Sequence, residues 1–337
     1  MKYYPLLLVF SLSFIFSCTI QDEVNIYSSR HYDTDLDLYK LFTEQTGIAI
    51  NLIEGSSDEL IERIRNEGIN SPADIVITVD AGRLWRAKEA DILKPHNSDY
   101  LNEVIPEELR DVDGQWVGLS ERVRGIIYNR ENISSDDLKG YRELADPEWE
   151  GRICVRSSNN IYNQSLTASL IESIGEEETE SWAAGLVRNF AQSPQGGDTD
   201  QIKAVAAGIC DLALANHYYL ARLLQPGSQQ DQEVASKVGI YFPTAEFGGT
   251  HVNISGAGVA ANSPNTENAI RFLEFLASED AQKIFALGNN EFPVLEGMDY
   301  SGVLRDFGAY ESDAVNVSMY GVNNPRAIRL MDRVGWR

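Results

Sequence analysis

Cysteine and histidine are scarce in this sequence of 337 residues, which has three cysteines and four histidines. No CxxC spacing occurs, so we do not expect a thiolate zinc site. The first strand is not followed by GxGxxG, and the motifs GxxxxGKS/T, HExxH and GxSxG are also absent. The sequence therefore gives no support to a nucleotide-dependent enzyme, a zinc protease or a serine hydrolase, and we predict that the protein is not an enzyme.

Basic residues are also few, because 28 lysines and arginines stand against 51 aspartates and glutamates, a formal net charge of −23. Such a surface repels nucleic acid and anionic membranes, so neither is expected as a partner. Hydrophobic residues make up 43% of the chain, which is typical of a folded protein and argues against global disorder. A chain of this length can bury two domain-sized cores.

Long apolar runs are missing except at the N-terminus, which reads "MKYYPLLLVFSLSFIFSC". One lysine, a short apolar stretch and small residues before Cys18 are typical of a secretory signal. We interpret residues 1–17 as a signal peptide and residues 18–23 as a linker. I-F-S-C resembles a lipobox, so Cys18 is a candidate for lipidation, and ordinary cleavage nearby is the alternative. The mature protein is expected to be exported and to be either soluble or tethered by one N-terminal lipid.

The two remaining cysteines are Cys154 in "GRICVRS" and Cys210 in "AGICDLALAN", short apolar stretches that read as strands of one domain. An oxidising compartment allows them to pair, and neighbouring strands could bring them within bridging distance. Two buried free thiols are the alternative. The sequence leaves a disulfide between Cys154 and Cys210 open.

Strand-like and helical segments alternate along most of the chain. "VNIYSS", "IAINLIEG" and "ADIVITVD" predict strands separated by helices, and "NNPRAIRLMDRVGW" predicts a C-terminal helix that starts at Asn-Pro. We predict an α/β, two-lobe periplasmic binding protein fold of the class II type, with mostly parallel central sheets, hinge strands and a ligand cleft between the lobes. One lobe would comprise residues 24–120 plus about 250–300, and the other residues 121–249 plus about 301–337.

Tyrosine is the more informative residue, because its 15 copies outnumber the 12 phenylalanines. Four tyrosines stand next to strand ends in polar surroundings, namely Tyr32 in "SRHYDTD", Tyr162 in "NNIYNQS", and Tyr218 with Tyr219 in "NHYYLA". A single tyrosine is usually a core or rim residue whose hydroxyl makes one hydrogen bond. An adjacent pair at a strand end or helix start, which Asn216 could cap, can instead turn towards one point.

Several phenols around one point favour a hard and strongly charged ion. A phenol, with a pKa of about 10, loses its proton only beside a strong positive charge such as Fe³⁺, whereas calcium and magnesium prefer carboxylates and carbonyls. Four phenolates around Fe³⁺ leave a formal negative charge, so a cation is expected nearby. Arg30, Arg122 and Arg222 lie in or near the right segments, and an ordinary surface charge or structural ion pair is the alternative for each.

The ordered set "YSSRHYDTD", "SPADIVITVDAGRLWRA", "GRICVRSSNNIYNQSL", "NHYYLAR" and "THVNISGAG" resembles the ferric-iron-binding proteins of cyanobacterial Fut-type ABC importers, within the bacterial transferrin-like group. The resemblance covers essentially the whole mature chain. It implies a periplasmic monomer that holds Fe(III) in an interlobe cleft and delivers it to an inner-membrane ABC permease. It also implies tyrosine ligands, with a histidine or water completing the set, and arginines that balance the charge. By position, the tyrosine ligands are Tyr32, Tyr162, Tyr218 and Tyr219, and the histidine that some family members add is His31. The arginines that match by position are Arg122 and Arg222, with Arg30 as a further candidate.

The expected mechanism is closure of two lobes on the ion, with Tyr32 completing a site that Tyr162, Tyr218 and Tyr219 begin on the other lobe. Fe(II) is an alternative cargo, which phenolates hold less well. A binding protein whose cleft arginines clamp an organic or oxyanion solute is the first alternative function. An exported hydrolase that uses a serine, His31 and an aspartate is a distant one.

Overall fold

The computed structural model describes residues 22–300 and 302–337, so the predicted signal peptide, Cys18 and most of the predicted linker lie outside the described residues. The strands are β1 Glu23–Ser28, β2 Ala49–Glu54, β3 Ile75–Val79, β4 Leu93–Lys94, β5 Trp116–Asn129, β6 Ile153–Cys154, β7 Leu212–Asn216, β8 Val238–Tyr241 and β9 Val252–Ala260. The α-helices are α1 Asp35–Thr46, α2 Ser57–Glu67, α3 Ala81–Glu89, α4 Asp99–Val104, α5 Ile161–Ile174, α6 Glu176–Arg188, α7 Asp198–Ala206, α8 His217–Leu224, α9 Gln229–Ser236, α10 Thr266–Leu276, α11 Glu279–Ile284, α12 Val303–Phe307 and α13 Ser318–Arg333. Each helix in the described ranges is too short or too polar to span a lipid bilayer.

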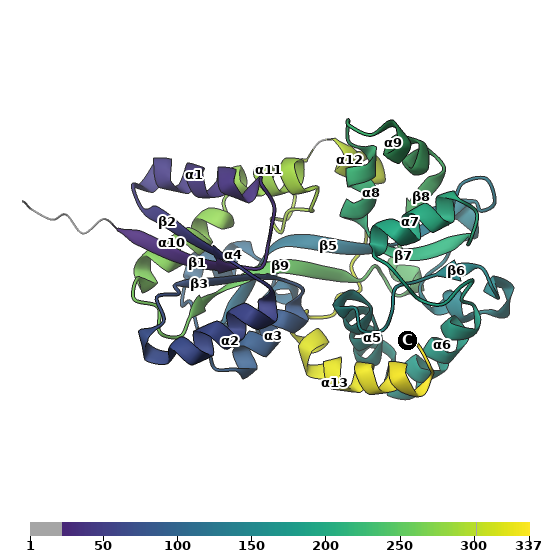
Figure 1. The fold of residues 1–337 in the computed structure, drawn as a ribbon, viewed down its shortest axis with the longest axis horizontal. Coiled ribbons are helices and arrows are strands. Elements are labelled where there is room, and N and C mark those ends of the chain that lie inside the picture. Colours follow the sequence, from purple (N-terminus) through teal and green to yellow (C-terminus); the bar gives the residue numbers. More distant parts are fainter. Residues whose placement is uncertain (1–21, 301) are drawn as a thin grey trace, which may run out of the picture.

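The long strand β5 joins two groups of strands. The strand order is β2-β1-β3-β9-β5-β7-β6, with β4 pairing to β9 and β8 to β5. Residues 116–123 of β5 pair with β9, and residues 124–128 pair with β7. In Figure 1, β5 and β9 run between a group that contains β1, β2 and β3 and a group that contains β6, β7 and β8. β5 therefore contributes side chains to both groups of strands.

The sheet is mixed and not mostly parallel, which corrects the sequence prediction. β1 pairs in parallel with β2 and β3, and β6 pairs in parallel with β7. All the strand pairs that β5 and β9 form are antiparallel. Parallel neighbours need a crossover connection, usually a helix. β5 and β9 instead run side by side in opposite directions between the two groups of strands. The predicted lobe boundaries stay a prediction, and β5 continues across residues 120 and 121 without a break.

The C-terminal helix α13 begins at Ser318, so the predicted start at Asn-Pro was wrong, and Pro325 lies inside the helix. The side chain of Asn316 accepts a hydrogen bond from the backbone nitrogen of Ser318 at 2.9 Å. Gly321 packs so closely on α3 that a Cβ there would lie 2.1 Å from Cγ of Trp85. α13 packs against both α3 and α5, below the two groups of strands in Figure 1. Tertiary packing therefore extends the helix beyond its local sequence signal.

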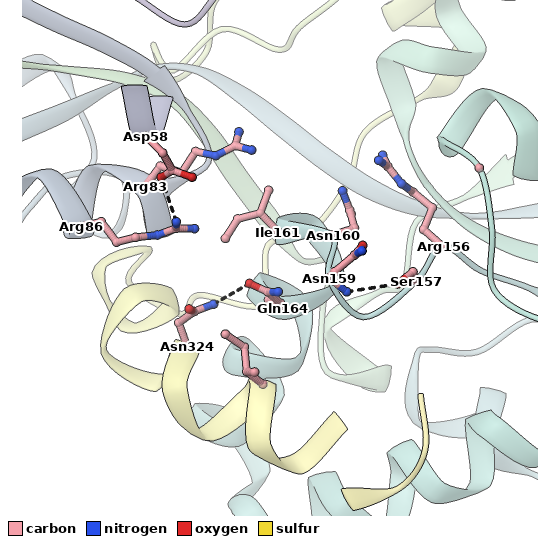
Figure 2. A pocket seen from close by; sticks show the side chains of 12 residues that line it. Asp58, Arg83, Arg86, Arg156, Ser157, Asn159, Asn160, Ile161, Gln164 and Asn324 are labelled. Atoms are coloured by element: carbon pink, nitrogen blue, oxygen red, sulfur yellow. Dashed lines mark hydrogen bonds and ion pairs between the residues drawn. The ribbon is translucent and has the colours of Figure 1, made fainter. Parts of the chain in front are cut away.

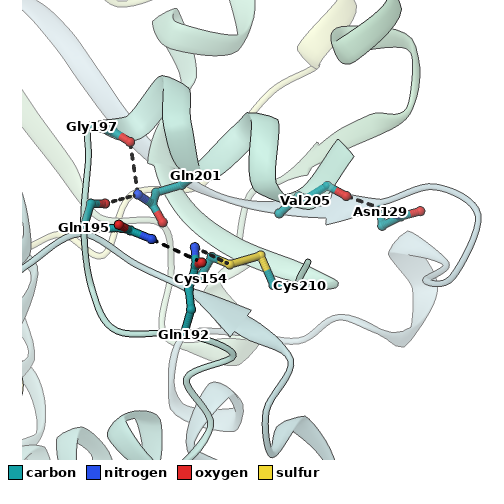
Figure 3. The surroundings of a disulfide bond; sticks show 8 residues. All are labelled: Asn129, Cys154, Gln192, Gln195, Gly197, Gln201, Val205 and Cys210. Atoms are coloured by element: carbon teal, nitrogen blue, oxygen red, sulfur yellow. Dashed lines mark hydrogen bonds between the residues drawn. A yellow bond between two sulfur atoms is a disulfide. The ribbon is translucent and has the colours of Figure 1, made fainter. Parts of the chain in front are cut away.

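Cys154 and Cys210 form a disulfide, the pairing that the sequence leaves open (Figure 3). Cys154 ends β6 and Cys210 lies two residues before β7, and these strands are parallel neighbours. The Cα atoms are 5.9 Å apart, and both side chains are buried. The bond ties together the ends of a segment that contains α5, α6 and α7, two of which contribute to the site described below.

Candidate metal centre

Three phenol oxygens lie around one guanidinium group, that of Arg122 on β5. Its Nη1 donates a hydrogen bond to the hydroxyl of Tyr32 at 3.2 Å, and its Nη2 donates to the hydroxyl of Tyr162 at 3.2 Å. Nη2 also donates to the hydroxyl of Tyr218. The three tyrosines come from the segment between β1 and α1, from the first turn of α5 and from the first turn of α8. Segments that are far apart in the sequence therefore converge on one point.

Tyr219 lies beside this group, with its ring centroid 4.5 Å from that of Tyr218. Tyr218 is fully buried and Tyr219 is partly exposed. The guanidinium carbon of Arg222 is 5.0 Å from the ring centroid of Tyr32, 5.1 Å from that of Tyr218 and 5.6 Å from that of Tyr219. The structure thus brings together the four predicted tyrosines, Arg122 and Arg222, and we call the four tyrosines the tyrosine cluster.

The adjacent tyrosines meet the same group because α8 begins directly after β7. Asn216 has the N-cap position by its backbone, but its side chain makes no capping hydrogen bond, unlike the sequence expectation. Its Nδ2 instead donates to the hydroxyl of Tyr218 at 3.1 Å, and its Oδ1 accepts from Arg124 at 3.0 Å. The side chain therefore positions a phenol. Arg222, one helical turn after Tyr218, covers the rings on the same face.

Arg30 is buried and paired on both sides. Its Nε lies 2.8 Å from Oδ2 of Asp35, and its Nη1 lies 2.9 Å from Oε2 of Glu291. Arg122 binds the other oxygen of Glu291 at 2.7 Å, so one carboxylate bridges two guanidinium groups. Burial opposes ionisation of Glu291, but Arg30 and Arg122 lower the pKa of its carboxyl to about 2. The Arg30 guanidinium carbon also lies 4.7 Å from the ring centroid of Tyr32.

A second buried carboxylate, that of Asp198 at the start of α7, holds two more arginines. Its Oδ2 lies 3.3 Å from Nη1 of Arg124, and its Oδ1 lies 3.2 Å from Nη1 of Arg156. Arg124 also donates to Oδ1 of Asn163 on α5 at 2.6 Å. The guanidinium carbon of Arg156 is 5.5 Å from the ring centroid of Tyr162. The second carboxylate therefore fixes cations along the other edge of the tyrosine cluster.

The surroundings of the tyrosine cluster carry more positive than negative charge. Five guanidinium groups and three carboxylates take part in the ion pairs and ring contacts described above, which leaves a formal charge of +2. They belong to Arg30, Arg122, Arg124, Arg156, Arg222, Asp35, Asp198 and Glu291. The buried arginines, Arg30, Arg122 and Arg124, are matched by three buried carboxylates, so the excess comes from the partly buried Arg156 and the exposed Arg222. Positive charge beside the cluster stabilises ionised phenols.

The pKa values of the clustered phenols differ. Burial opposes ionisation of Tyr162, but Arg122 and the hydroxyls of Tyr218 and Tyr219 outweigh it, so the pKa of Tyr162 lies below its ordinary value. Burial raises the pKa of Tyr219 to about 12, with Tyr162 and Asp198 adding to the shift. Burial also raises the pKa of Tyr218 well above its usual range, despite the nearby Arg122. Of these three phenols Tyr162 ionises first, and the others need a further positive charge.

His31 follows Arg30 in the segment between β1 and α1 and faces Glu54. Its side chain is 59% exposed, and its Nδ1 is 3.3 Å from Oε1 of Glu54. Both residues line a small cavity of 180 Å³ in front of α1, which Tyr32 and Arg30 also line. The structure does not direct the imidazole to the phenol oxygens, so a ligand role for His31 stays a prediction.

Sequence reasoning missed Glu291, Arg124 and Asp198. Arg124 follows Arg122 by two residues on β5, so both side chains lie on one face of the strand, and this spacing could have revealed it. Glu291 and Asp198 carry no local signal, because only folding brings them to the arginines. Within residues 22–300 and 302–337, no group of three or more His, Cys, Asp or Glu side chains is arranged to hold a metal ion. Phenols are therefore the distinctive oxygen donors of this site.

A cavity of 640 Å³ is lined mainly by cationic and amide side chains, with the carboxylate of Asp58 among them (Figure 2). Arg83 and Arg86 on α3 line it, together with Arg156, which also contacts the ring of Tyr162. Its polar wall consists of Ser157, Asn159, Asn160, Gln164 and Asn324. Arg86 is paired with Asp58 at 3.1 Å. Guanidinium and amide groups in a cavity suit an anion, and carboxylates in particular bind arginine in a bidentate manner.

Comparison with known proteins identifies the family. The family described as bacterial extracellular solute-binding protein matches residues 70–307. Iron uptake protein A1 of Synechocystis sp. is 50% identical over 317 residues, which is 94% of this chain and 88% of that relative. This chain belongs to the bacterial extracellular solute-binding proteins.

Solved structures of solute-binding proteins agree with this assignment. A Trichodesmium protein, IdiA or FutA, in complex with iron and citrate ligands, matches with a TM-score of 0.92 and 57% identity over 94% of this chain and 100% of that one. Apo FutA2 from Synechocystis PCC6803 matches with a TM-score of 0.90 and 52% identity, over 94% of this chain and 100% of that one. The predicted two-lobe binding-protein fold and the resemblance to Fut-type ferric-iron-binding proteins are confirmed.

Proposed function

We propose that this solute-binding protein captures Fe³⁺ in the periplasm through tyrosinate ligands and delivers it to an ABC permease. The observation that carries the proposal is the convergence of the hydroxyls of Tyr32, Tyr162 and Tyr218 on one guanidinium group. Tyr219 would complete the four ligands. Relatives that are named for iron uptake, or solved with iron, support iron as the cargo. The protein would act as a monomer.

Charge balance supports a trivalent ion at this position. Four phenolates and one Fe³⁺ ion together carry a formal charge of −1. The arginines in the ion pairs around the tyrosine cluster outnumber the carboxylates, and this positive excess would balance that charge. Arg122, which donates to three phenol oxygens without iron, would balance the phenolates once they ionise. Tyr162, whose pKa is already lowered, would lose its proton first. The ion itself would lower the pKa of the remaining phenols.

The position of Tyr32 supports capture by closure. Tyr32 follows β1, whereas Tyr162, Tyr218 and Tyr219 belong to helices that follow β6 and β7. An ion that binds ligands from both groups of strands adds contacts that only the closed state has, and so favours that state. Reduction would weaken these contacts, because Fe²⁺ carries less charge and prefers softer ligands than phenolate. Delivery to the permease would then follow opening, protonation or reduction.

Iron-loaded protein is expected to show a visible absorption band from phenolate-to-Fe³⁺ charge transfer. The band should disappear with dithionite, because reduction removes the electron-accepting ferric state. Metal analysis and a spectrum of protein purified without chelator, before and after dithionite, would measure this. Protein loaded with Ga³⁺ is the matched control and should be colourless. Stoichiometric Fe³⁺ without any visible band would show that phenolates are not ligands.

A carboxylate-bearing anion that accompanies iron is the second candidate ligand. The 640 Å³ cavity with Arg83, Arg86 and Arg156 favours it, and the Trichodesmium relative was solved with citrate. The clamps expected from sequence for such a solute are Arg30, Arg122 and Arg222. Arg30 and Arg122 are instead paired with buried carboxylates, and Arg222 lies over the rings of the tyrosine cluster.

Citrate is therefore expected to bind the protein, and Arg83→Gln is expected to weaken it by about tenfold, the loss of one charge-assisted hydrogen bond. Titration calorimetry with citrate on iron-free and iron-loaded protein would measure this. Arg271→Gln, which changes an exposed arginine on α10, is the control and should leave the affinity unchanged. If citrate binds neither form of the protein, this second candidate fails.

A further inference from the structure

A second cavity lies on the other face of β5 from the tyrosine cluster. It has a volume of 340 Å³, and we call it the Glu121 pocket because Glu121 of β5 lines it. The residues that matter to its chemistry are Glu108, Glu121, Phe292, Glu296, Tyr300 and Tyr310. A volume of this size is at the small end of ligand pockets, which span about 300–1,000 Å³.

A short antiparallel bridge separates this pocket from the tyrosine cluster. The backbone nitrogen of Glu121 donates to the oxygen of Phe292 at 2.7 Å, and that of Phe292 donates to the oxygen of Glu121 at 3.1 Å. Successive side chains of extended backbone point to opposite faces. Arg122 and Glu291 accordingly pair beside the tyrosines, whereas Glu121 and Phe292 line the pocket. The pocket is therefore distinct from the proposed iron site.

The pocket wall is negative and lacks a counter-charge. Among the described residues that line it, three are glutamates and none is lysine, arginine or histidine. The Tyr310 hydroxyl donates to Oε2 of Glu121 at 2.8 Å. Burial raises the pKa of Glu121 to about 7, and Glu108 and Glu296 add to the shift against the hydrogen bond from Tyr310. A cation that enters the pocket would stabilise the ionised form of this carboxylate.

Aromatic rings form another part of the wall. The ring centroid of Phe292 is 5.3 Å from that of Tyr300 and 4.9 Å from that of Tyr310, and both pairs meet edge to face. Ring faces attract ammonium groups, and more strongly where water is excluded. The carboxylates are not grouped as metal ligands in the described part of the chain. Carboxylate and aromatic groups together therefore suit an organic cation better than a metal ion.

We propose that the Glu121 pocket binds a small organic ammonium ion, with Glu121 as the counter-charge and the rings of Phe292, Tyr300 and Tyr310 around its alkyl or methyl groups. This site is separate from the iron proposed above, and its test needs no iron. The ligand would enter the space between β5, the segment after Phe292 and the segment before Ser312.

Titration calorimetry of iron-free protein with 1,4-diaminobutane and with tetramethylammonium, at pH 8 and about 0.15 M salt, would test the site. That salt concentration screens the diffuse attraction of an acidic surface for cations. At least one probe is expected to bind at a ratio of one to one, whereas the neutral analogue 1-butanol should bind more weakly than either. If neither amine binds at concentrations up to about 10 mM, its Kd is above the millimolar range, and the proposal is overturned.

Glu121→Gln is expected to weaken amine binding by more than about tenfold, because it removes the partly buried counter-charge and keeps the shape. Glu131→Gln, the same change at an exposed site, should leave the affinity unchanged. Amine binding that survives in Glu121→Gln would place the ligand elsewhere and contradict the proposal.

The stability of the same variant shows whether it still folds. The raised pKa of Glu121 means that its charged carboxylate destabilises the fold above pH 7, so the Tm of Glu121→Gln at pH 8 should not fall below that of the parent.

Tyr300→Leu provides a second test that does not depend on Glu121. Leucine keeps an apolar wall but removes the ring face, so tetramethylammonium should bind several-fold more weakly. Tyr300 is only partly buried, which limits the effect on folding. Unchanged tetramethylammonium affinity in Tyr300→Leu would exclude the aromatic part of the site.

Discussion

Replacing Tyr219 with phenylalanine is expected to lower the affinity for Fe³⁺ by more than about a hundredfold, since even partners outside the ligand shell of a metal typically contribute about 10–100-fold. The change removes one phenolate oxygen and keeps the ring, which packs 4.5 Å from the ring of Tyr218 and beside Arg222. The Tm of the iron-free protein should therefore change little. Competition with a chelator of known affinity would measure the loss, and the visible band should weaken or shift in parallel.

Tyr100→Phe is the matched control, because it removes a phenol oxygen from an exposed tyrosine on α4 that is 40% accessible. Iron affinity and colour should equal those of the parent in this variant. If Tyr219→Phe also retained the parental affinity, Tyr219 would not be a ligand, and the proposed set would shrink to the three tyrosines that contact Arg122.

The tyrosine cluster could be predicted from sequence because its members stand at element boundaries. Tyr162 and Tyr218 occupy first turns of helices that follow strands, and the resemblance of the flanking motifs supplied the grouping. The pairing of Glu291 with Arg30 and Arg122 could not be predicted in this way. It joins side chains that are more than 160 residues apart in the chain, and a buried glutamate looks the same in sequence as the many exposed ones.

The fold shows the same division between local and distant information. The sequence analysis predicted hinge strands between the lobes, but it could not give the antiparallel pairing of β5 and β9, which depends on how the two groups of strands meet. The predicted start of α13 was wrong because Pro325 was taken as its first turn. The helix instead begins at Ser318 and continues past Pro325, and Gly321 packs on Trp85 within this added part. Cys154 and Cys210 needed the register of β6 against β7 before their pairing could be decided.

Glu291→Gln is expected to lower the free energy of unfolding of the iron-free protein by about 3–5 kcal/mol, the cost of breaking a buried ion pair from one side. The carboxylate is fully buried and bridges Arg30 and Arg122, so its loss leaves two buried guanidinium groups without this partner. Ser120 and Ser255, which also donate to Glu291, would remain to bind the amide. Urea denaturation at pH 7.5 would measure the difference.

Glu62→Gln is the control, because it breaks the pair with Arg65 on the surface of α2, where the two side chains are 59% and 53% exposed. An exposed pair of this kind contributes less than about 1 kcal/mol, so this variant should be nearly as stable as the parent. A loss below about 1 kcal/mol in Glu291→Gln as well would mean that the bridge adds no more to stability than a surface pair does.

The pH dependence of the same variant separates a lost charge from lost packing. The pKa of Glu291 falls from 4.5 to about 2 on folding, so its ionisation stabilises the folded protein. This stabilisation is complete above pH 4.5 and disappears as the pH falls through about 2. The stability difference between parent and Glu291→Gln should therefore be constant from pH 6 to pH 8 and should shrink steadily below pH 4.5. A difference that stays the same down to pH 3 would instead indicate that the substitution disturbs packing around Ser120 and Ser255, and that the charge of the bridge contributes little.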